Sequence, residues 1–263
     1  MIVLVLAAGY ATRLYPLTLD TPKPLLKVGH KLLIEHIFDK VGRLDGVKKC
    51  FVVTNDKFFD KLEKWANTFS AGGGSAMNSV KSGIGGGLSM LIRVVNDMTT
   101  TNENRLGAIR DIEFVVQKEK IDDDLLVIGG DNLFGFALTD FVKFANGRKP
   151  NASFAVFDIK ERKKASIYGV VKVDSSSKVV DFQEKPSNPG SSLISTCVYY
   201  FPREKLNLIS KYLAVEKRSD ATGNYIKWLS ETDGIYGFIF REKWYDIGDI
   251  ESYKKANEEY KGG

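Results

Sequence analysis

Two basic side chains follow the first apolar segment of the sequence. Arg13 and Lys23 lie within "AAGYATRLYPLTLDTPKPLL", directly after the hydrophobic run "IVLVL". That run ends in Ala7, Ala8 and Gly9, whose small side chains allow the backbone N–H groups to approach a ligand closely. Two cations beside such a turn are suited to neutralising a polyphosphate. We therefore predict that this segment wraps a nucleoside triphosphate (NTP).

The common glycine-rich phosphate loops are absent from this segment. Neither GxxxxGK[ST] nor GxGxxG follows the first apolar run, so kinases, GTPases and dinucleotide dehydrogenases of the usual types lose support. Taken singly, Arg13 or Lys23 is more often a solvated surface charge, and small residues alone are also typical of an ordinary turn between a strand and a helix. The prediction depends on their combination.

Two acidic residues far apart in the sequence are candidates for a metal site. In "LLVIGGDN", Asp131 follows a buried aliphatic run, and ligands of open α/β sheets bind outside the carboxyl ends of strands. In "WYDIGDIESY", Asp246 lies between bulky residues, and Asp249 is placed to cap a helix. Mg²⁺ typically takes one or two protein carboxylates and fills its other positions with phosphate and water. Asp131 and Asp246 are thus candidate Mg²⁺ ligands, although the sequence alone does not pair them and Asp131 also fits a turn or helix cap.

The elements that must position these residues form an α/β pattern. Short apolar runs alternate with helical patterns, at 2–7, 48–54, 91–96, 124–130 and 152–159. This spacing predicts a mostly parallel sheet flanked by helices. From Leu32 onward, apolar residues recur at three- and four-residue steps as far as Leu44, which predicts the first helix. The segments "SIYGVVKVD", "KVVDFQEKP" and "LISTCVYYF" are joined by turn residues and indicate a smaller antiparallel or mixed part.

Composition and charge narrow the class of partner. The 38 Lys and Arg exceed the 33 Asp and Glu by only five and are spread through the chain, which does not favour nucleic acid as a partner. Cys50 and Cys197 lie in separate apolar stretches, so we expect core thiols in a reducing compartment. The first apolar run is too short for a signal peptide or a membrane span, so we expect a cytoplasmic protein that does not bind a membrane.

Several prominent features are given ordinary structural roles. The acidic cluster 122–124 precedes its strand and is predicted to be a solvated loop. His30 and His36 have no partner at metal-ligand spacing and are predicted to lie at the surface or its boundary. The Gly-rich stretch 70–90 has the composition of a flexible linker, and its two glycine triplets suggest an engineered insertion. We assign no function to that stretch.

The motifs taken together resemble a known family. "LAAGYATRLYPLT", "TPKPLL", "GGDN", "YGVVKVD", "FQEKP" and "WYDIGD" occur in the order seen in sugar-phosphate nucleotidylyltransferases, and the resemblance extends from Met1 to about Tyr260. It implies a single Rossmann-like, glycosyltransferase-A-like domain over 1–263, with a nucleotide-binding half at 1–140 and an acceptor-binding half at 141–263. It also implies a Mg²⁺-dependent enzyme that joins an NTP and a small phosphorylated acceptor, a sugar 1-phosphate, to give an NDP-sugar and pyrophosphate by in-line attack on the α-phosphate. A homo-oligomer is compatible with this resemblance.

The resemblance assigns roles to individual residues. Arg13 and Lys23 would hold the triphosphate, and Asp131 and Asp246 would hold Mg²⁺. Lys185 of "EKP" would bind the phosphate of the acceptor. The remaining nucleotide-binding residues would be Leu6, Ala7, Ala8, Gly9, Thr12 and Gly107, with Gly107 close to the base, and the remaining acceptor-binding residues would be Tyr168, Gly169 and Glu184.

Departures from the family pattern leave the substrates open. Tyr10 and Ala11 replace a smaller pair in the first loop, and the glutamine usual in thymidylyl- and uridylyltransferases is absent after "NRLGA". The base is therefore not assigned. Cytidylyl transfer to a non-sugar phosphate such as phosphocholine is an alternative, as is a non-catalytic regulatory subunit or engineered scaffold with the same fold. Because the sequence ends soon after "WYDIGD", we expect no hexapeptide-repeat β-helix and no acetyl transfer.

Overall fold

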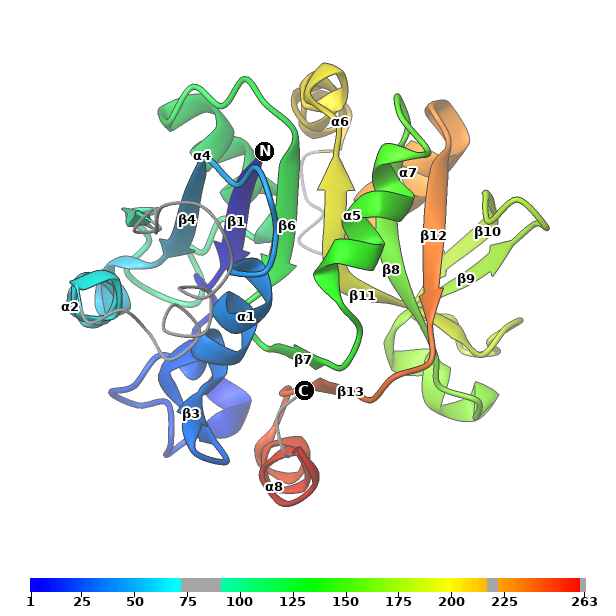
Figure 1. Ribbon diagram of the computed structural model, residues 1–263. Coiled ribbons are helices and arrows are strands. Elements are labelled where there is room, and N and C mark those ends of the chain that lie inside the picture. The colour runs from blue at the N-terminus through cyan, green and yellow to red at the C-terminus, as the bar shows by residue number, and fades with distance from the viewer. Residues whose placement is uncertain (72–90, 217–221, 261–263) are drawn as a thin grey trace. The chain divides into compact units, whose positions relative to one another are not determined.

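The computed structural model describes residues 1–71, 91–216 and 222–260 (Figure 1). The Gly-rich stretch predicted at 70–90 therefore lies outside the described residues, apart from its first two positions. Within the described ranges, no helix has both the length and the apolar character needed to cross a membrane. The chain divides into two compact units. The first unit comprises Met1–Leu106, Ile128–Leu138 and Lys243–Gly263, and the second comprises Gly107–Val127 and Thr139–Glu242.

The predicted functional halves 1–140 and 141–263 follow a different division. Residues 107–127 group with the second unit, and the C-terminal segment from Lys243 groups with the first. The roles given to the halves stay a prediction. The segment containing Asp246 thus belongs to the same compact unit as the first loop.

Parallel strands form the base of the first unit. β4 (Lys49–Thr54) lies between β1 (Ile2–Leu6) and β5 (Ile92–Asn96), and both pairings are parallel. Buried, mostly apolar residues fill β1 and β4 after Lys49, as expected for strands covered on both faces. Because the strands are parallel, their carboxyl ends meet at one edge, where the first loop begins. β6 (Leu125–Gly129) falls across the division, with Ile128 and Gly129 in the first unit.

The first helix forms where the apolar periodicity predicts it. α1 (Leu33–Val41) buries the predicted stripe, but it ends at Val41, before Leu44. The expectation that His36 lies at the surface or its boundary is wrong, because only 7% of this residue is exposed. Its ring lies edge-on to Tyr260, with the ring centroids 5.0 Å apart, and Nε2 lies 2.9 Å from the carbonyl oxygen of Val28. A distant segment covers this part of the helix, which the local pattern does not reveal.

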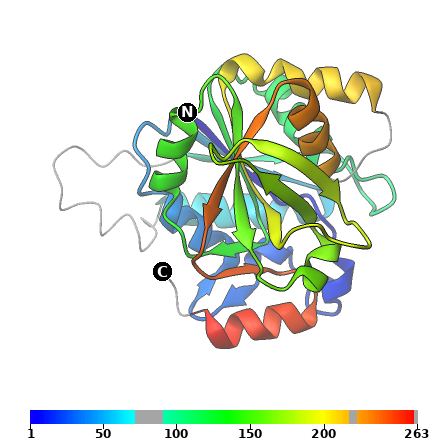
Figure 2. The same cartoon turned by 90° about the vertical axis from the view of Figure 1, so that its right-hand side faces the viewer.

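Shorter elements complete the first unit. β7 (Asn132–Phe134) pairs antiparallel with β13 (Trp244–Asp246), and α8 (Ile250–Glu259) runs beside this pair (Figure 2). Asp249 caps α8 as predicted, with its carboxylate accepting a 2.8 Å hydrogen bond from the Ser252 N–H. The other elements are η1 (Thr12–Leu14), η2 (Lys23–Leu25), β2 (Lys27–Val28), β3 (Lys31–Leu32), η3 (Asp56–Phe58) and α2 (Phe59–Ala71).

Mixed strand pairing in the second unit confirms the prediction for the later part of the chain. β8 (Ala152–Asp158) pairs antiparallel with β11 (Leu193–Phe201) and parallel with β12 (Ile235–Phe240). β9 (Gly169–Val173) pairs antiparallel with β10 (Val179–Glu184) and with β11. The helices are α4 (Ala108–Lys118), α5 (Leu138–Asn146), η4 (Arg162–Ile167), η5 (Arg203–Lys205), α6 (Asn207–Val215) and α7 (Thr222–Thr232).

Within the predicted solvated loop at 122–124, Asp124 is held by several donors. The Asp124 carboxylate accepts hydrogen bonds from Lys149 Nζ at 2.5 Å, Tyr200 Oη at 2.8 Å and the Arg203 backbone N–H at 3.0 Å. Burial by itself would raise the pKa of Asp124, but these donors hold the pKa below its ordinary value. The solvated-loop prediction is wrong for Asp124, because donors from later in the chain fold onto it, whereas the Asp122 side chain is 72% exposed as predicted.

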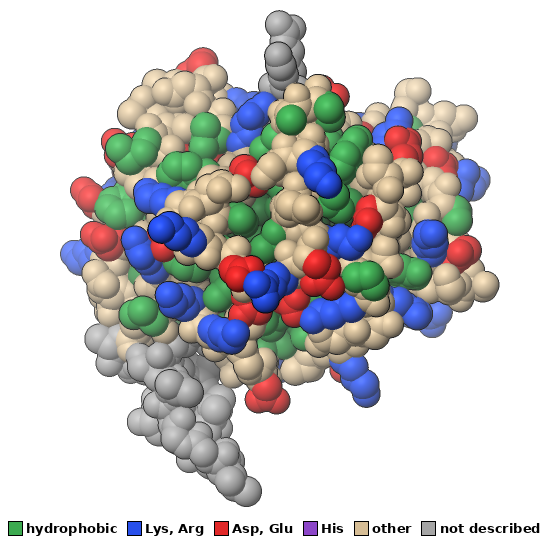
Figure 3. Space-filling view, turned by 90° about the horizontal axis from the view of Figure 1, so that it is seen from above, with side chains coloured by type: hydrophobic (Ala, Val, Ile, Leu, Met, Phe, Trp, Pro, Cys, Tyr) green, Lys and Arg blue, Asp and Glu red, His purple; other side chains and the backbone are tan. Residues whose placement is uncertain are grey.

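The two cysteines differ in burial, and charges of both signs are mixed at the surface. Cys50 is a buried thiol as predicted, whereas Cys197 is partly exposed, so its prediction as a core thiol is wrong. Figure 3 shows Lys and Arg side chains interspersed with Asp and Glu on one face of the protein. That face has no large field of a single charge sign, in keeping with the even spread of charge along the sequence.

Candidate functional site

The first loop is held by side chains at the carboxyl end of β4. Asn55 Nδ2 donates to the carbonyl oxygen of Ala8 at 2.9 Å, and Thr54 Oγ1 donates to that of Ala7 at 3.4 Å. Thr54 and Asn55 are both fully buried. A Cβ atom placed on Gly9 would have no atom within 4 Å, so the space beside it is open. The loop therefore has fixed carbonyl groups and an open side.

The backbone N–H groups of this loop are available to a ligand. Among the described residues, no hydrogen-bond acceptor is found for the N–H groups of residues 8–12. Ala11 adopts the left-handed region at φ 49°, and its carbonyl oxygen accepts a 2.8 Å hydrogen bond from Thr18 Oγ1. Successive N–H groups around a left-handed residue form an anion-binding concavity. This geometry suits a phosphate group.

Pairing of β7 with β13 brings the two candidate metal ligands together. Asp131 directly precedes β7, Asp246 ends β13, and Asp246 pairs with Asn132 across the two strands. The Ile247 N–H also donates to the carbonyl oxygen of Asp131 at 3.1 Å. The structure thus supplies the pairing that the sequence could not.

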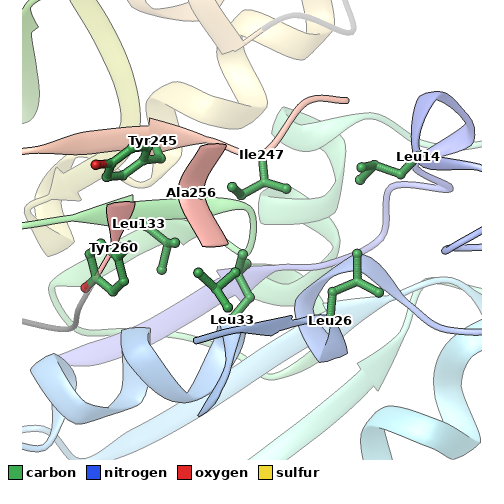
Figure 4. Packing of buried hydrophobic residues seen from close by; sticks show 9 residues of the cluster. Leu14, Leu26, Leu33, Leu133, Tyr245, Ile247, Ala256 and Tyr260 are labelled. Atoms are coloured by element: carbon green, nitrogen blue, oxygen red, sulfur yellow. The ribbon is translucent and has the colours of Figure 1, made fainter. Parts of the chain in front are cut away.

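One hydrophobic cluster anchors the neighbours of the charged residues (Figure 4). Leu14, which follows Arg13, contributes a buried side chain to this cluster. So do Tyr245 and Ile247, which flank Asp246. Its remaining buried members are Leu26, Val28, Leu33, Leu133, Ala256 and Tyr260. Because interiors are close-packed, fixing these apolar neighbours fixes the backbone from which the charged side chains extend.

One predicted cation contacts a carboxylate, and the other lies near the second carboxylate. Lys23 Nζ donates to Asp131 Oδ2 at 2.8 Å and to the carbonyl oxygen of Ile247 at 2.9 Å. Arg13 meets Asp246 across Gly248, since a Cβ atom placed on Gly248 would lie 3.7 Å from Arg13 Nη2 and 3.8 Å from Asp246 Oδ2. All four residues that were predicted to be catalytic therefore converge within the first unit.

The backbone at Gly130 lies very close to the end of β1. The Gly130 N–H donates to the carbonyl oxygen of Leu6 at 2.8 Å. A Cβ atom on Gly130 would lie only 2.7 Å from that oxygen, so a larger residue would force the two segments apart. Glycine at this position therefore allows Asp131 to sit next to the end of β1.

The two carboxylates have opposite pKa shifts. Burial favours the neutral form of Asp131, but the charge and hydrogen bond of Lys23 outweigh it and hold the pKa of Asp131 below its ordinary value. For Asp246, burial and the nearby negative charge of Asp131 raise the pKa to about 6, against the opposing effect of Lys23 and Arg13. Two carboxylates this close repel each other, and a divalent cation between them would relieve that repulsion.

The residues fit a Mg²⁺ site of the kind that is completed by substrate. Asp131 is 31% exposed at its side chain, and Asp246 accepts no hydrogen bond at its carboxylate from any described residue. Within the described ranges, no cluster of three or more His, Cys, Asp or Glu side chains is arranged to hold a metal. Two oxygen ligands from protein match Mg²⁺, which takes its remaining ligands from phosphates and water.

The predicted acceptor-binding residues gather in the second unit. Glu184 pairs with Gly169 across β9 and β10, and the Lys185 N–H donates to the carbonyl oxygen of Tyr168 at 3.1 Å. Lys185 has φ 45°, a left-handed conformation that costs energy for a side-chain-bearing residue and often marks a functional site. Its Nζ lies 3.8 Å from Glu184 Oε1 and is largely exposed.

Glu184 lies between two glycines, one of which the sequence reasoning missed. A Cβ atom on Gly169 would lie 3.1 Å from Glu184 Oε2, and one on Gly223 in the first turn of α7 would lie 1.7 Å from it. Burial raises the pKa of Glu184, and the nearby ammonium of Lys185 only partly offsets it. Nothing in the local sequence around Gly223 indicates this contact, because it depends on how α7 packs against β10.

The remaining predicted nucleotide-binding residues lie in both units. Leu6 ends β1, and Thr12 begins η1 and is exposed. Gly107 precedes α4 with φ 88°, a conformation that favours glycine, and it begins the second unit. Its contact with a nucleobase stays a prediction.

Comparison with known proteins places this arrangement in context. The sequence profile described as Nucleotidyl transferase matches residues 2–262. Over 255 residues the chain is 27% identical to the bifunctional protein GlmU of Methanocaldococcus jannaschii, an alignment that covers 97% of this chain and 53% of that protein. The chain thus spans about half the length of that relative.

Solved structures share the fold. A putative glucose-1-phosphate thymidylyltransferase from Bacillus anthracis, in complex with a sucrose, matches with a TM-score of 0.77 at 21% identity and covers 98% of this chain and 94% of that chain. A UDP-glucose pyrophosphorylase complexed with UDP-glucose matches with a TM-score of 0.78 at 19% identity and covers 98% and 97%. The predicted α/β class, a mostly parallel sheet flanked by helices, is confirmed.

Proposed function

Because this chain belongs to the nucleotidyl transferase family, we propose that it joins an NTP and a sugar 1-phosphate to give an NDP-sugar and pyrophosphate. The observation that carries the proposal is the convergence of Arg13, Lys23, Asp131 and Asp246 beside a loop whose backbone N–H groups lack protein acceptors. Cations, oxygen ligands and N–H donors are the groups that a triphosphate requires.

The reaction follows from the charges of its participants. A phosphate oxygen of the acceptor attacks the α-phosphorus of the NTP, a new P–O bond forms, and the bond to the β-phosphate breaks to release pyrophosphate. The attacking oxygen is already anionic, so no protein nucleophile is needed. Positioning of the two reactants in line contributes on the order of 7–11 kcal/mol in well-oriented intramolecular reactions.

This chain supplies binding and charge compensation for that reaction. The N–H groups of residues 8–12 and the Arg13 guanidinium bind the triphosphate oxygens, and Lys23 keeps Asp131 ionised. Asp131 and Asp246 would hold Mg²⁺, which supplies neutralisation of phosphate charge when bound. Preorganised charges of this kind stabilise a transition state without having to reorient during the reaction.

The second unit provides the acceptor-binding residues in this proposal. The Lys185 ammonium binds the acceptor phosphate, and the Glu184 carboxylate accepts hydrogen bonds from sugar hydroxyl groups near Tyr168 and Gly169. Support comes from the position of Glu184, whose side chain is 18% exposed and accepts no hydrogen bond from any described residue. The names of the two solved structures, a putative glucose-1-phosphate thymidylyltransferase and a UDP-glucose pyrophosphorylase, support a sugar phosphate as the acceptor class.

A second candidate is cytidylyl transfer to phosphocholine. The observation that favours it is the same carboxylate, because a half-buried Glu184 without a protein hydrogen-bond donor also suits a cationic headgroup. A sugar would be recognised through its hydroxyl groups, and choline through its positive charge. The two acceptors are therefore distinguished by their chemistry at this one residue.

The test is a pyrophosphate-release screen with purified protein. ATP, CTP, GTP, UTP and dTTP are each paired with hexose 1-phosphates, N-acetylhexosamine 1-phosphates and phosphocholine in the presence of Mg²⁺. We expect release with a sugar 1-phosphate, and release slower by about 10²-fold or more with the Asp246→Asn variant. Release with CTP and phosphocholine alone would favour the second candidate, and no release above the variant for any pair would contradict both.

A further inference from the structure

Side chains alternate between two faces of the β7–β13 pair. Leu133 and Tyr245 enter the hydrophobic cluster of the first unit (Figure 4). Since successive residues of a strand point to opposite faces, Asn132, Trp244 and Asp246 share the other face. Trp244 therefore lies on the same side as the candidate metal ligand two residues later, and not in the core.

A continuous hydrogen-bond chain runs from two residues of this face to Asp131. Trp244 Nε1 donates to Asn132 Oδ1 at 2.8 Å, and Asn132 Nδ2 donates to Asp131 Oδ1 at 2.8 Å. Asn132 is only 2% exposed, so water competes little for its amide. The chain joins residues 112 positions apart in the sequence and ends on the carboxylate that Lys23 contacts at its other oxygen.

The indole N–H determines which way the Asn132 amide points. An indole nitrogen is a donor only, so it requires the amide oxygen as its partner. The amide NH₂ is then directed at Asp131. The reversed amide would place NH₂ against the indole N–H and its oxygen against the carboxylate, which would leave both contacts repulsive.

We infer that Trp244 and Asn132 are positioning residues that fix the orientation of the Asp131 carboxylate for metal binding. Asn132 holds Oδ1 and Lys23 holds Oδ2, so rotation of the carboxylate would break at least one hydrogen bond. Partners of this kind orient metal ligands, and their loss typically lowers metal affinity or activity by about 10- to 100-fold. This inference rests on the proposed function, because it concerns the same Mg²⁺ site.

The main test is Trp244→Phe, which keeps an aromatic ring and removes the indole N–H. Mn²⁺ replaces Mg²⁺ as a probe, and its binding is measured by electron paramagnetic resonance in the presence of the α,β-methylene analogue of the NTP selected by the pyrophosphate screen. Trp65→Phe is the matched control, because Trp65 Nε1 also donates within the first unit, to Glu35 at 3.4 Å. We expect Trp244→Phe to weaken Mn²⁺ binding by roughly 10-fold or more, and Trp65→Phe to leave it within twofold.

A double-mutant cycle tests whether the two residues act through one chain. Asn132→Ala removes the direct donor to Asp131 and should weaken Mn²⁺ binding at least as much as Trp244→Phe. Combining both changes should add little to Asn132→Ala alone, since residues in one hydrogen-bond network are not additive. The urea midpoint of each variant is measured as well, to show that its fold is intact. The acceptor KM should stay within twofold of the wild-type value.

Each contrary result has a distinct meaning. If the wild-type protein does not bind the manganese nucleotide, the proposed function fails and the positioning role falls with it. If the wild type binds it and Trp244→Phe weakens binding no more than Trp65→Phe, only the positioning role is overturned. Fully additive effects in the cycle, or a change confined to the acceptor KM, would also overturn it.

Discussion

Asp131 in the first unit and Glu184 in the second unit are both partly buried carboxylates, but their surroundings differ. Asp131 accepts hydrogen bonds from Asn132 and Lys23, and its pKa lies below the ordinary value. Glu184 accepts none from the described residues, lies between two glycines, and has a raised pKa. One carboxylate is satisfied by protein, and the other keeps its hydrogen-bonding capacity for a ligand.

This difference indicates two ways of preparing a site. A metal ligand gains from fixed orientation, because the cation tolerates little misplacement of its oxygens. A carboxylate that binds a small acceptor works best without hydrogen bonds from the protein. Each donor on the ligand then replaces a water molecule and does not have to displace a protein donor. The partly buried Glu184 carboxylate without protein donors lowers the stability of the folded protein, as is usual for functional residues.

The largest expected effect comes from neutralising the first-unit carboxylates. Asp131→Asn or Asp246→Asn should lower kcat by about 10²–10³-fold or more, because each removes a charged ligand from the centre of charge compensation. Steady-state pyrophosphate release measures this, with circular dichroism to show that the fold is intact. Asp249→Asn is the matched control, since asparagine also caps a helix and should preserve turnover. Near-normal turnover in either of the first two variants would count against the metal assignment.

Displacing the Glu184 carboxylate should have the next largest effect. It should change the acceptor KM and leave the NTP KM unchanged. Gly223→Ala places a methyl group 1.7 Å from the present position of Glu184 Oε2, so the carboxylate must move. We expect the acceptor KM to rise by about 10- to 100-fold, as a shift of about 1 Å can cost 10²-fold, with the NTP KM unchanged. Gly190→Ala is the control, because its methyl would meet only the flexible end of Lys172. Equal acceptor KM values for the two variants would exclude the role of Glu184.

Removing the Lys185 ammonium should have a smaller effect of the same kind. Lys185→Ala removes a charge-assisted hydrogen bond to the acceptor phosphate, worth about 1.5–3 kcal/mol, so the acceptor KM should rise roughly 10-fold or more. The control is Lys164→Ala, since Lys164 makes an exposed ion pair with Glu161 in the same unit. Initial rates at varied acceptor concentration separate the two variants. An unchanged acceptor KM would discredit the phosphate-binding role.

The smallest expected effects concern stability and have opposite signs for two acidic residues. Asp124→Asn should destabilise the protein by about 1–3 kcal/mol at pH 7, because three donors lose a charged acceptor. The pKa of Asp124 is lowered by folding, so its stabilisation is present above the ordinary pKa near 4 and disappears as the pH falls through the lowered value. The difference in the free energy of unfolding between Asp124→Asn and the wild type should therefore become smaller as the pH is lowered below about 4, as measured by urea unfolding.

Glu184→Gln should behave in the opposite way. Folding raises the pKa of Glu184, so ionisation at pH 7 destabilises the folded protein, and this penalty disappears as the pH falls below the ordinary pKa near 4. The variant should have a higher Tm than wild type at pH 7 and an equal Tm at pH 4, measured by thermal unfolding. A lower Tm at pH 7 would show that Glu184 is satisfied by protein after all.

Local sequence patterns determined much of the fold and the family. The apolar runs predicted β1, β4, β5 and β6, the periodic stripe predicted α1, and Asp249 predicted the cap of α8. Such features depend on neighbouring residues, whose spacing decides burial and backbone hydrogen bonding. The ordered motifs also identified the family, as the profile match confirms.

Only the tertiary structure decided which distant residues meet. The pairing of Asp246 with Asn132, the chain from Trp244 to Asp131, the contact of Gly223 with Glu184 and the burial of His36 all join segments far apart in the sequence. Strand register and helix packing set these contacts, and a shift of one residue in a strand would turn its side chains to the opposite face. The sequence therefore supplied the chemical groups, and long-range packing decided their partners.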